Sequence, residues 1–292
     1  MARETQLLAD GIYFGEGPRW HAGRLWFSDF YAKAVKSVSL AGDLRTEIEL
    51  DDLPSGLGWM PDGSMLIVSM TKRLLLRRSA DGTITRHADL GAIAGFHCND
   101  MAVDAAGRAY VGNFGFDLDG EITARGAAAV IADHKTADLA CVEPDGTASV
   151  AATGMHFPNG TVITPDGRTM IIGETLAGIL TAFDIAPDGT LANRRIWAPT
   201  LPRLPDGIAL DAAGHVWIAN PLAPECALIA EGGAVLEVIE TGQPCYACML
   251  GGDDGRTLFM LTAASSHSSE AAAAPTGKLL VATVDTPHAG RP

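Results

Sequence analysis

The chain has 292 residues with 21 basic and 35 acidic side chains, and its formal net charge of −14 argues against a nucleic acid or an anionic membrane as partner. Hydrophobic residues at 47% and charged residues at 19% are typical of a folded globular protein, and an odd count of five cysteines argues against a disulfide framework. No apolar stretch has the length of a signal sequence core or a membrane span, so we expect a cytoplasmic protein.

One pattern recurs six times along the chain, namely a turn ending in glycine followed by an apolar run rich in aromatic or branched residues. In chain order the segments are WHAGRLWFSD (20–29), MPDGSMLIVS (60–69), DAAGRAYVGN (104–113), TPDGRTMIIG (164–173), DAAGHVWIAN (211–220) and GDDGRTLFML (252–261). Their turn glycines are Gly23, Gly63, Gly107, Gly167, Gly214 and Gly255. Such a spacing, mostly about 40 to 50 residues, is typical of propellers and solenoids.

Further turns within the repeats indicate four strands per unit. A short apolar strand precedes each turn glycine, and second turns follow at 80–82, 144–146 and 187–189. Helical periodicity is not sustained anywhere, which argues against helical repeats. The sequence therefore predicts an all-β fold, a six-bladed β-propeller with four-stranded antiparallel blades and a metal site on the central axis. Length alone would suggest two domains, but the repeat favours a single domain over 1–292; a pair of β-sandwiches is the alternative.

The terminal segments and two insertions complete this prediction. TQLLADGIYF (5–14) and KLLVATVD (278–285) are expected to pair in the last blade and so remove its exposed edges. The long interval between the third and fourth repeats leaves an insertion over 114–138, which is either a lid over a site or a plain surface loop. Residues 265–277 are low in complexity and are expected to form a mobile loop.

Polar residues recur seven or eight positions before the turn glycines, where the innermost strand of each blade begins. These positions hold Glu16, Ser55, Asn99, Asn159, Asp206 and Ala247. Innermost strands line a propeller's channel, so we expect these side chains to converge on the axis. Crowded oxygens, two of them anionic, favour a hard divalent cation such as Ca²⁺, Mg²⁺ or Mn²⁺, with Zn²⁺ a less natural choice. The alternative is that Pro-Asn-Gly and Pro-Asp-Gly are ordinary turn tripeptides.

A second set of polar residues lies six or seven positions after the same glycines. It comprises Asp29, Ser69, Asn113, Glu174, Asn220 and Thr262. The second strand of a blade runs antiparallel to the first, so these residues are expected at the same rim of the channel. One face of the disc would then carry two rings of polar groups.

Five stretches resemble the SMP-30/gluconolactonase/LRE family, which includes the senescence marker protein-30 or regucalcin proteins. They are GEGPRWHAGRLWFSD (15–29), CNDMAVDAAGRAYVGN (98–113), FPNGTVITPDGRTM (157–170), LPDGIALDAAGHVWIAN (204–220) and MLGGDDGRTLFMLTA (249–263). The resemblance implies a six-bladed propeller with one divalent metal held by Glu16, Asn159 and Asp206, and typically lactone hydrolysis. It also implies Asp206 as the catalytic acid and base, and Asn99 near metal and substrate.

One position departs from the pattern of that family. Many sugar-lactone members have an arginine two residues before the asparagine of the Asn-Asp motif, where it holds substrate oxygens; this chain has His97. An imidazole does not reproduce a fixed guanidinium fork, which argues against an aldonolactone substrate while leaving His97 as an expected substrate-binding residue.

The expected reaction is hydrolysis of a small-molecule lactone. The metal would polarise the lactone carbonyl, and a water deprotonated by Asp206 or by the metal would attack it. The alternatives are a promiscuous esterase or organophosphate hydrolase and a non-catalytic calcium-binding propeller. The sequence contains no G-x-S-x-G or HExxH motif, which excludes the corresponding serine hydrolases and zinc proteases. Cys245 and Cys248 form a lone CxxC pair, best interpreted as structural.

Overall fold

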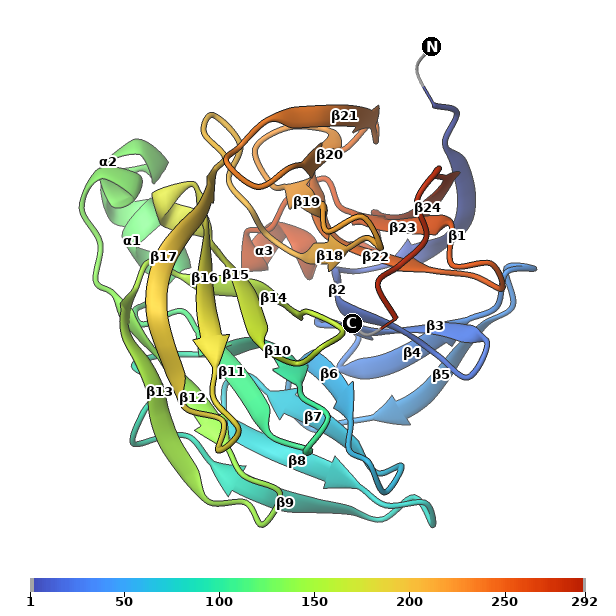
Figure 1. Ribbon diagram of the computed structural model, residues 1–292. Coiled ribbons are helices and arrows are strands. Elements are labelled where there is room, and N and C mark those ends of the chain that lie inside the picture. Colours follow the sequence, from blue (N-terminus) through green and yellow to red (C-terminus); the bar gives the residue numbers. More distant parts are fainter. Residues whose placement is uncertain (1–2, 291–292) are drawn as a thin grey trace.

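Residues 3–290, which the computed structural model describes, form six four-stranded antiparallel sheets arranged as blades around a central axis (Figure 1). The innermost strands of neighbouring blades pack against one another around the ring. The prediction of a six-bladed β-propeller is confirmed.

The blades follow one another in chain order. The first three consist of β2 (Gly15–His21), β3 (Arg24–Asp29), β4 (Ala34–Val38) and β5 (Leu44–Glu49); of β6 (Pro54–Trp59), β7 (Met65–Ser69), β8 (Leu74–Arg78) and β9 (Ile84–Asp89); and of β10 (Cys98–Val103), β11 (Ala109–Asn113), β12 (Ala137–Val142) and β13 (Ala148–Met155). The next two consist of β14 (Pro158–Ile163), β15 (Thr169–Glu174), β16 (Ile179–Ile185) and β17 (Leu191–Pro199); and of β18 (Ile208–Leu210), β19 (Val216–Asn220), β20 (Glu225–Ile229) and β21 (Val235–Glu240).

The last blade combines the two ends of the chain. Its strands are β22 (Cys245–Gly251), β23 (Thr257–Thr262), β24 (Gly277–Thr283) and, outermost, β1 (Gln6–Ile12). β1 pairs antiparallel with β24, with Gln6 opposite Val281. The predicted pairing of the two terminal segments is confirmed, and it ties the last blade to the start of the chain.

Glycines serve two different purposes in each repeat. The six turn glycines that define the repeat all have φ between 70° and 89°, which glycine adopts without steric cost. A second group follows the ring positions and allows close packing of the innermost strands. A Cβ at Gly160 would lie 2.5 Å from the Asp206 carbonyl oxygen, and one at Gly207 would lie 2.6 Å from Ala247 Cα. Asn159-Gly160 and Asp206-Gly207 are therefore interstrand contacts at the axis rather than turns.

The inner strands of each blade are apolar on both faces because each blade is packed between two others. In β7, Leu66 and Val68 join a cluster with Met101 of the third blade. Met65 and Ile67 point the other way and join Val35 of the first blade. Successive side chains on a strand alternate between faces, so a continuous apolar run such as MLIVS is what a blade between two neighbours requires.

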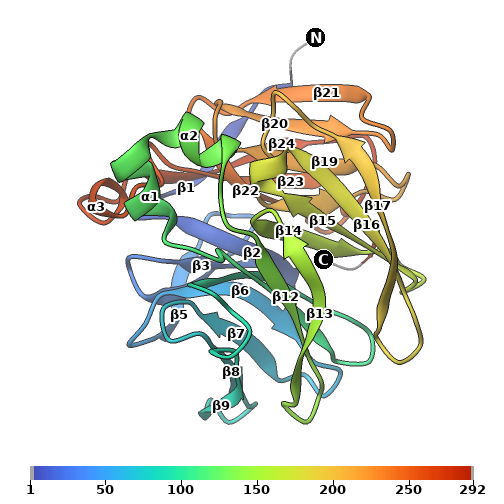
Figure 2. The ribbon, with the colours of Figure 1, turned by 90° about the vertical axis from the view of Figure 1, so that its left-hand side faces the viewer.

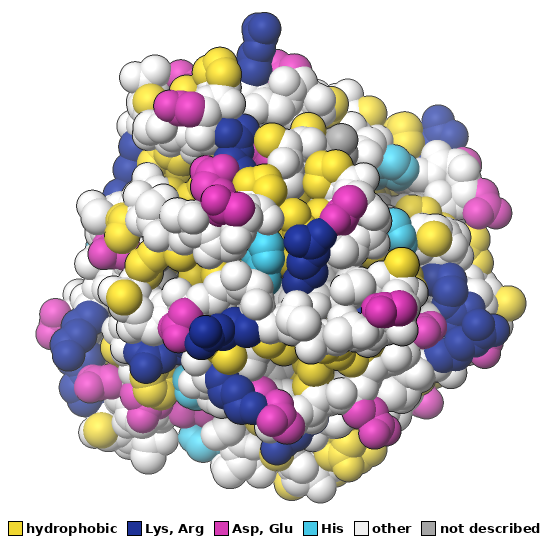
Figure 3. Space-filling view, turned by 90° about the horizontal axis from the view of Figure 1, so that it is seen from below, with side chains coloured by type: hydrophobic (Ala, Val, Ile, Leu, Met, Phe, Trp, Pro, Cys, Tyr) yellow, Lys and Arg dark blue, Asp and Glu magenta, His cyan; other side chains and the backbone are white. Residues whose placement is uncertain are grey.

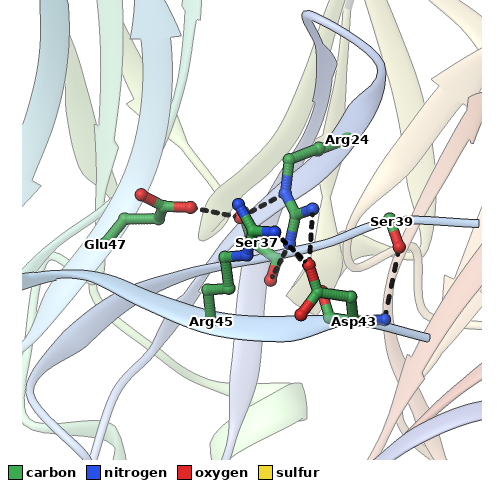
Figure 4. A network of polar contacts seen from close by, with 6 residues as sticks. All are labelled: Arg24, Ser37, Ser39, Asp43, Arg45 and Glu47. Atoms are coloured by element: carbon green, nitrogen blue, oxygen red, sulfur yellow. Dashed lines mark hydrogen bonds and ion pairs between the residues drawn. The ribbon is translucent and has the colours of Figure 1, made fainter. Parts of the chain in front are cut away.

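The outer edges of the blades are polar. In the first blade Arg24 Nε donates to Ser37 Oγ at 2.7 Å, and Ser37 Oγ donates to Glu47 at 2.6 Å (Figure 4). Asp43 pairs with Arg24 at 3.2 Å and with Arg45 at 2.5 Å. Figure 3 shows acidic and basic side chains interspersed on one side of the molecule. Exposed pairs of this kind contribute little stability individually, and they keep the outer strands solvated.

Three short helices lie together on one face of the disc (Figure 2). α1 (Leu118–Arg125) and α2 (Ala127–Ala132) come from the insertion over 114–138, and α3 (Ser268–Ala271) from the segment 265–277. Asp117 caps α1 by accepting a hydrogen bond from Gly120 N, and Asp119 of α1 accepts one from Ser268 N. Within the described residues no helix is long and apolar enough to cross a membrane.

Candidate functional site

A cavity of about 710 Å³ lies between the axis and the helices on this face. Glu16, Asn99, Asn159 and Asp206 lie at its inner end, where the innermost strands meet, and His97 is also part of the lining. α1 and α2 contribute Leu118, Ile122, Val130 and Ile131 to the same cavity. All five predicted site residues thus line one cavity, and the insertion forms part of its wall, as a lid does.

The innermost strands position the four oxygen-bearing side chains. Glu16, Asn99 and Asn159 are each the second residue of their strand, in β2, β10 and β14, whereas Asp206 lies two residues before β18. All four are at most 8% exposed. Ser55 and Ala247 complete the ring without lining the cavity, and Ser55 Oγ lies 3.3 Å from Asn99 Oδ1.

A chain of hydrogen bonds fixes the two amide groups. Asn99 Nδ2 donates to Asn159 Oδ1 at 3.0 Å, and Asn159 Nδ2 donates to Thr175 Oγ1 at 3.1 Å. The Thr175 hydroxyl donates its proton to the Pro205 carbonyl oxygen at 2.7 Å, so towards Asn159 it acts only as a hydrogen-bond acceptor. Thr175 therefore orients the Asn159 amide, with the nitrogen turned to Thr175 and the oxygen turned to Asn99.

Burial and like charge dominate the electrostatics of the two carboxyl groups. Burial raises the pKa of Glu16 well above its usual value, and the nearby Asp206 and Asp100 raise it further. Burial and then Asp100 raise the pKa of Asp206, while the Asn159 amide partly opposes this. Removing carboxylates from water and placing them together disfavours their charged forms.

Asp100 and Arg19 belong to the same charged group, although the sequence pattern did not single them out. Both are at most 5% exposed. The Arg19 guanidinium donates to the carbonyl oxygens of Pro18 and Met101. Burial raises the pKa of Asp100, and Arg19 opposes that effect. Within the described part of the chain, Asp100 Oδ1 is a buried oxygen without a hydrogen-bond partner.

This donor set fits a hard divalent cation. With Glu16, Asp100 and Asp206 ionised and Arg19 protonated, the buried group carries a net charge of −2. Glu16, Asn159 and Asp206 supply oxygen ligands only, which suits Ca²⁺, Mg²⁺ or Mn²⁺ better than Zn²⁺. Over 3–290 no three His, Cys, Asp or Glu side chains gather as a metal site, and a set of Glu16, Asn159 and Asp206 would include one amide oxygen.

The second polar ring lies at the same end of the blades as the first, as expected, since Asp29 is opposite Gly15 and Asn113 is opposite Cys98, but none of its residues lines the cavity. Its six residues end the second strands, and all are at most 3% exposed. Asp29 accepts hydrogen bonds from Tyr13 N and Phe14 N and pairs with Lys36 at 2.7 Å. Glu174 accepts from His156 N. Such residues fix the loops at the strand ends, because buried backbone N–H groups need acceptors.

The histidines near the ring have different surroundings. His97 stacks on Phe96 with 4.1 Å between ring centroids and lies 6.0 Å from Phe114. Burial lowers the pKa of His97, which favours a neutral imidazole. His156 does not line the cavity, and its Nδ1 lies 2.9 Å from His134 Nε2.

The cysteines have no place in this site. All five are buried free thiols, in agreement with a structural interpretation of the CxxC pair.

Comparison with known proteins gives the same picture of the chain. A pentonolactonase from Haloferax volcanii is 26% identical over 283 residues, covering 91% of this chain and 87% of that protein. A luciferin-regenerating enzyme superposes with a TM-score of 0.82 at 17% identity, covering 98% of this chain and 97% of its own. A calcium-binding regucalcin from Agrobacterium tumefaciens superposes with a TM-score of 0.79 at 20% identity, covering 98% and 95%. These two structures share the fold. The profile of the SMP-30/Gluconolactonase/LRE-like region matches residues 14–264, and the chain belongs to this family.

Proposed function

We propose that the protein is a divalent-metal-dependent hydrolase that opens a lactone ring. The observation that carries the proposal is the convergence of four buried oxygen-bearing side chains, two of them carboxyl groups with raised pKa, at the inner end of a covered cavity. The relative from Haloferax volcanii, which is named a pentonolactonase, supports a lactone as substrate.

Glu16, Asn159 and Asp206 would hold the cation. When bound, a divalent cation supplies Lewis-acid polarisation of a carbonyl oxygen. Thr175 keeps the Asn159 oxygen turned away from itself.

Asp206 is the proposed base for the attacking water. The water oxygen forms a bond to the carbonyl carbon while its proton passes to the Asp206 carboxylate. The bond between that carbon and the ring oxygen then breaks, and Asp206 returns the proton to the departing alkoxide. The product is a hydroxy acid. Asn99 lines the cavity and donates one amide proton to Asn159, and we propose that its second amide proton binds a substrate oxygen while the neutral His97 imidazole contacts the substrate from the wall.

Acid release from a panel of lactones tests this function. The protein is stripped with a chelator, reloaded with Ca²⁺, Mg²⁺, Mn²⁺ or Zn²⁺ in turn, and followed with a pH indicator. We expect hydrolysis of at least one lactone that disappears on stripping and returns on reloading. Hydrolysis that survives stripping contradicts metal dependence. Turnover of aryl esters or phosphoesters alone would favour the esterase interpretation, and bound metal without any turnover would favour a binding protein.

The expected setting of the reaction stays a prediction. We propose a small-molecule substrate and a cytoplasmic location. Because the net charge is −14, neither nucleic acid nor a membrane is proposed as partner.

A further inference from the structure

The wall of the cavity is aromatic from its inner end to its lid. Phe14 lies 4.7 Å from Tyr246 and 5.3 Å from Phe30, measured between ring centroids. Across the cavity Phe114 lies 4.7 Å from Phe157. All five side chains line the cavity, and they come from the first, third, fourth and last blades or the segments next to their strands. The result is a continuous apolar surface between the oxygen donors and the helices.

The lid extends this surface. Leu118 and Ile122 of α1 and Val130 and Ile131 of α2 point into the cavity, and Phe116, Phe157 and Leu176 form an apolar cluster with Val130. An apolar inner side of the lid buries a matching ligand surface when it covers the site.

The polar groups of the wall are two carboxylates that already accept hydrogen bonds, Asp117 and Asp119, and several neutral side chains such as His97 and Tyr31. Asp117 accepts from Gly120 N, and Asp119 accepts from Ser268 N. Over residues 3–290 neither a lysine nor an arginine lines the cavity. Arg73, near His97, donates to the carbonyl oxygens of Gly91 and Ala94 instead. An anionic group on the substrate would find no basic partner in this wall, and hydroxyl groups along its length would lie mostly against apolar side chains away from the inner end.

The size of the cavity also favours a substrate larger than a bare sugar lactone. About 710 Å³ lies in the range of roughly 300 to 1,000 Å³ over which pockets bury drug-sized ligands, and such pockets have mostly apolar walls with a few polar groups that fix orientation. A bare sugar lactone would leave much of this volume unfilled.

We infer that the substrate is an uncharged lactone whose ring carries an extended alkyl or aryl substituent. The inference rests on the proposed function: the ring carbonyl meets the oxygen donors at the inner end, and the substituent lies along Phe14, Phe114 and Phe157 beneath α1 and α2. The hydroxy acid product is anionic, and the carboxylates of Asp117 and Asp119 in the wall disfavour its retention.

A matched series of γ-lactones with straight alkyl substituents, compared with a pentono-1,4-lactone, tests the inference on the metal-loaded protein. We expect kcat/KM to rise with chain length, by up to about fourfold for each added methylene until the cavity is filled. Alkyl lactones should exceed the hydroxylated lactone by at least about tenfold. A pentonolactone that is opened as fast as, or faster than, every alkyl lactone overturns the inference while leaving the proposed function intact.

Binding of alkyl-substituted lactams, which the reaction does not open, separates the two proposals. We expect their dissociation constants, measured by calorimetry, to fall as the chain grows. If no lactone is opened but the lactams bind with this dependence, the proposed function fails and the apolar site stands. If the lactams do not bind more tightly as the chain grows, the inference fails.

Variants of α1 and α2 test whether these helices cause the preference for long alkyl chains. Ile122→Asn places an amide on the cavity side of α1, and Ile131→Asn does so on α2. Each should lower the ratio of kcat/KM for octyl over methyl lactone by about tenfold, since a buried isoleucine contact is lost. Ala128→Asn, at an exposed position of α2 outside the cavity, is the matched control and should leave the ratio unchanged. An unchanged ratio in both isoleucine variants contradicts the inference.

Discussion

Replacing Glu16 by glutamine should stabilise the metal-free protein at neutral pH. Glu16 is 5% exposed, and its carboxyl group lies near Asp206 and Asp100, with Arg19 as a nearby buried cation. Glutamine keeps the shape and can still accept from Gly17 N, as Glu16 Oε2 does at 3.3 Å. The substitution therefore removes a buried charge and retains its local hydrogen bond.

The upward pKa shift of Glu16 means that its ionisation destabilises the folded protein. The folded-state pKa of Glu16 lies well above its ordinary value of 4.5, so between the two values the folded state holds a proton that the unfolded state has lost. Stability from this group is present below pH 4.5 and is lost as the pH rises toward the folded-state pKa. The variant lacks that loss, so its advantage grows with pH.

The expected gain is that of removing one uncompensated buried charge, about 1 to 3 kcal/mol. For a domain of this size that corresponds to a rise in Tm of roughly 2 to 5 °C. Thermal melts with a chelator, from acidic to neutral pH, measure it, and Glu240→Gln on the surface is the control. Added Ca²⁺ should stabilise the unaltered protein more than the variant. A Glu16→Gln protein that melts at or below the unaltered protein at neutral pH refutes the reasoning.

Two further predictions concern how the site is held in place. Thr175→Val removes the hydroxyl that orients Asn159, so metal affinity measured by titration should fall about tenfold or more. Thr175→Ser keeps the hydroxyl and should retain the affinity. Equal affinities of the Val and Ser variants would contradict the positioning role of Thr175. Gly160→Ala places a Cβ 2.5 Å from the Asp206 carbonyl oxygen and should destabilise the fold by about 1 to 3 kcal/mol in chemical denaturation. Gly214→Ala, with open space around its Cβ, should cost only the strain of positive φ, and a smaller loss for Gly160→Ala would count against close strand packing.

The spacing of turn glycines predicted the six blades because each hairpin needs a residue with positive φ at the same place. The same spacing located Glu16, Asn159 and Asp206, since equivalent positions of a circular repeat meet at its axis. The fold and the inner end of the cavity can therefore be predicted from a turn that recurs along the chain.

The remaining features depend on contacts that a repeat does not encode. Asp29 and Glu174 have the same polarity as a site residue, yet they bind loop N–H groups and neighbouring side chains. Asp100 was missed because the pairing of β10 with β11 is irregular between Cys98 and Met101, so simple alternation does not predict where it points. The aromatic wall is assembled from single residues far apart in sequence, such as Phe14 and Phe157, which have no common local pattern.

The central claim is that one buried carboxylate serves both cation binding and hydrolysis, and Asp206→Ala tests it most directly. Metal affinity and the rate of lactone opening are measured on the same preparation, with melting curves to establish that the variant is folded. We expect turnover to be abolished and metal binding to weaken together. A folded Asp206→Ala protein that opens lactones at an intact rate would contradict the account.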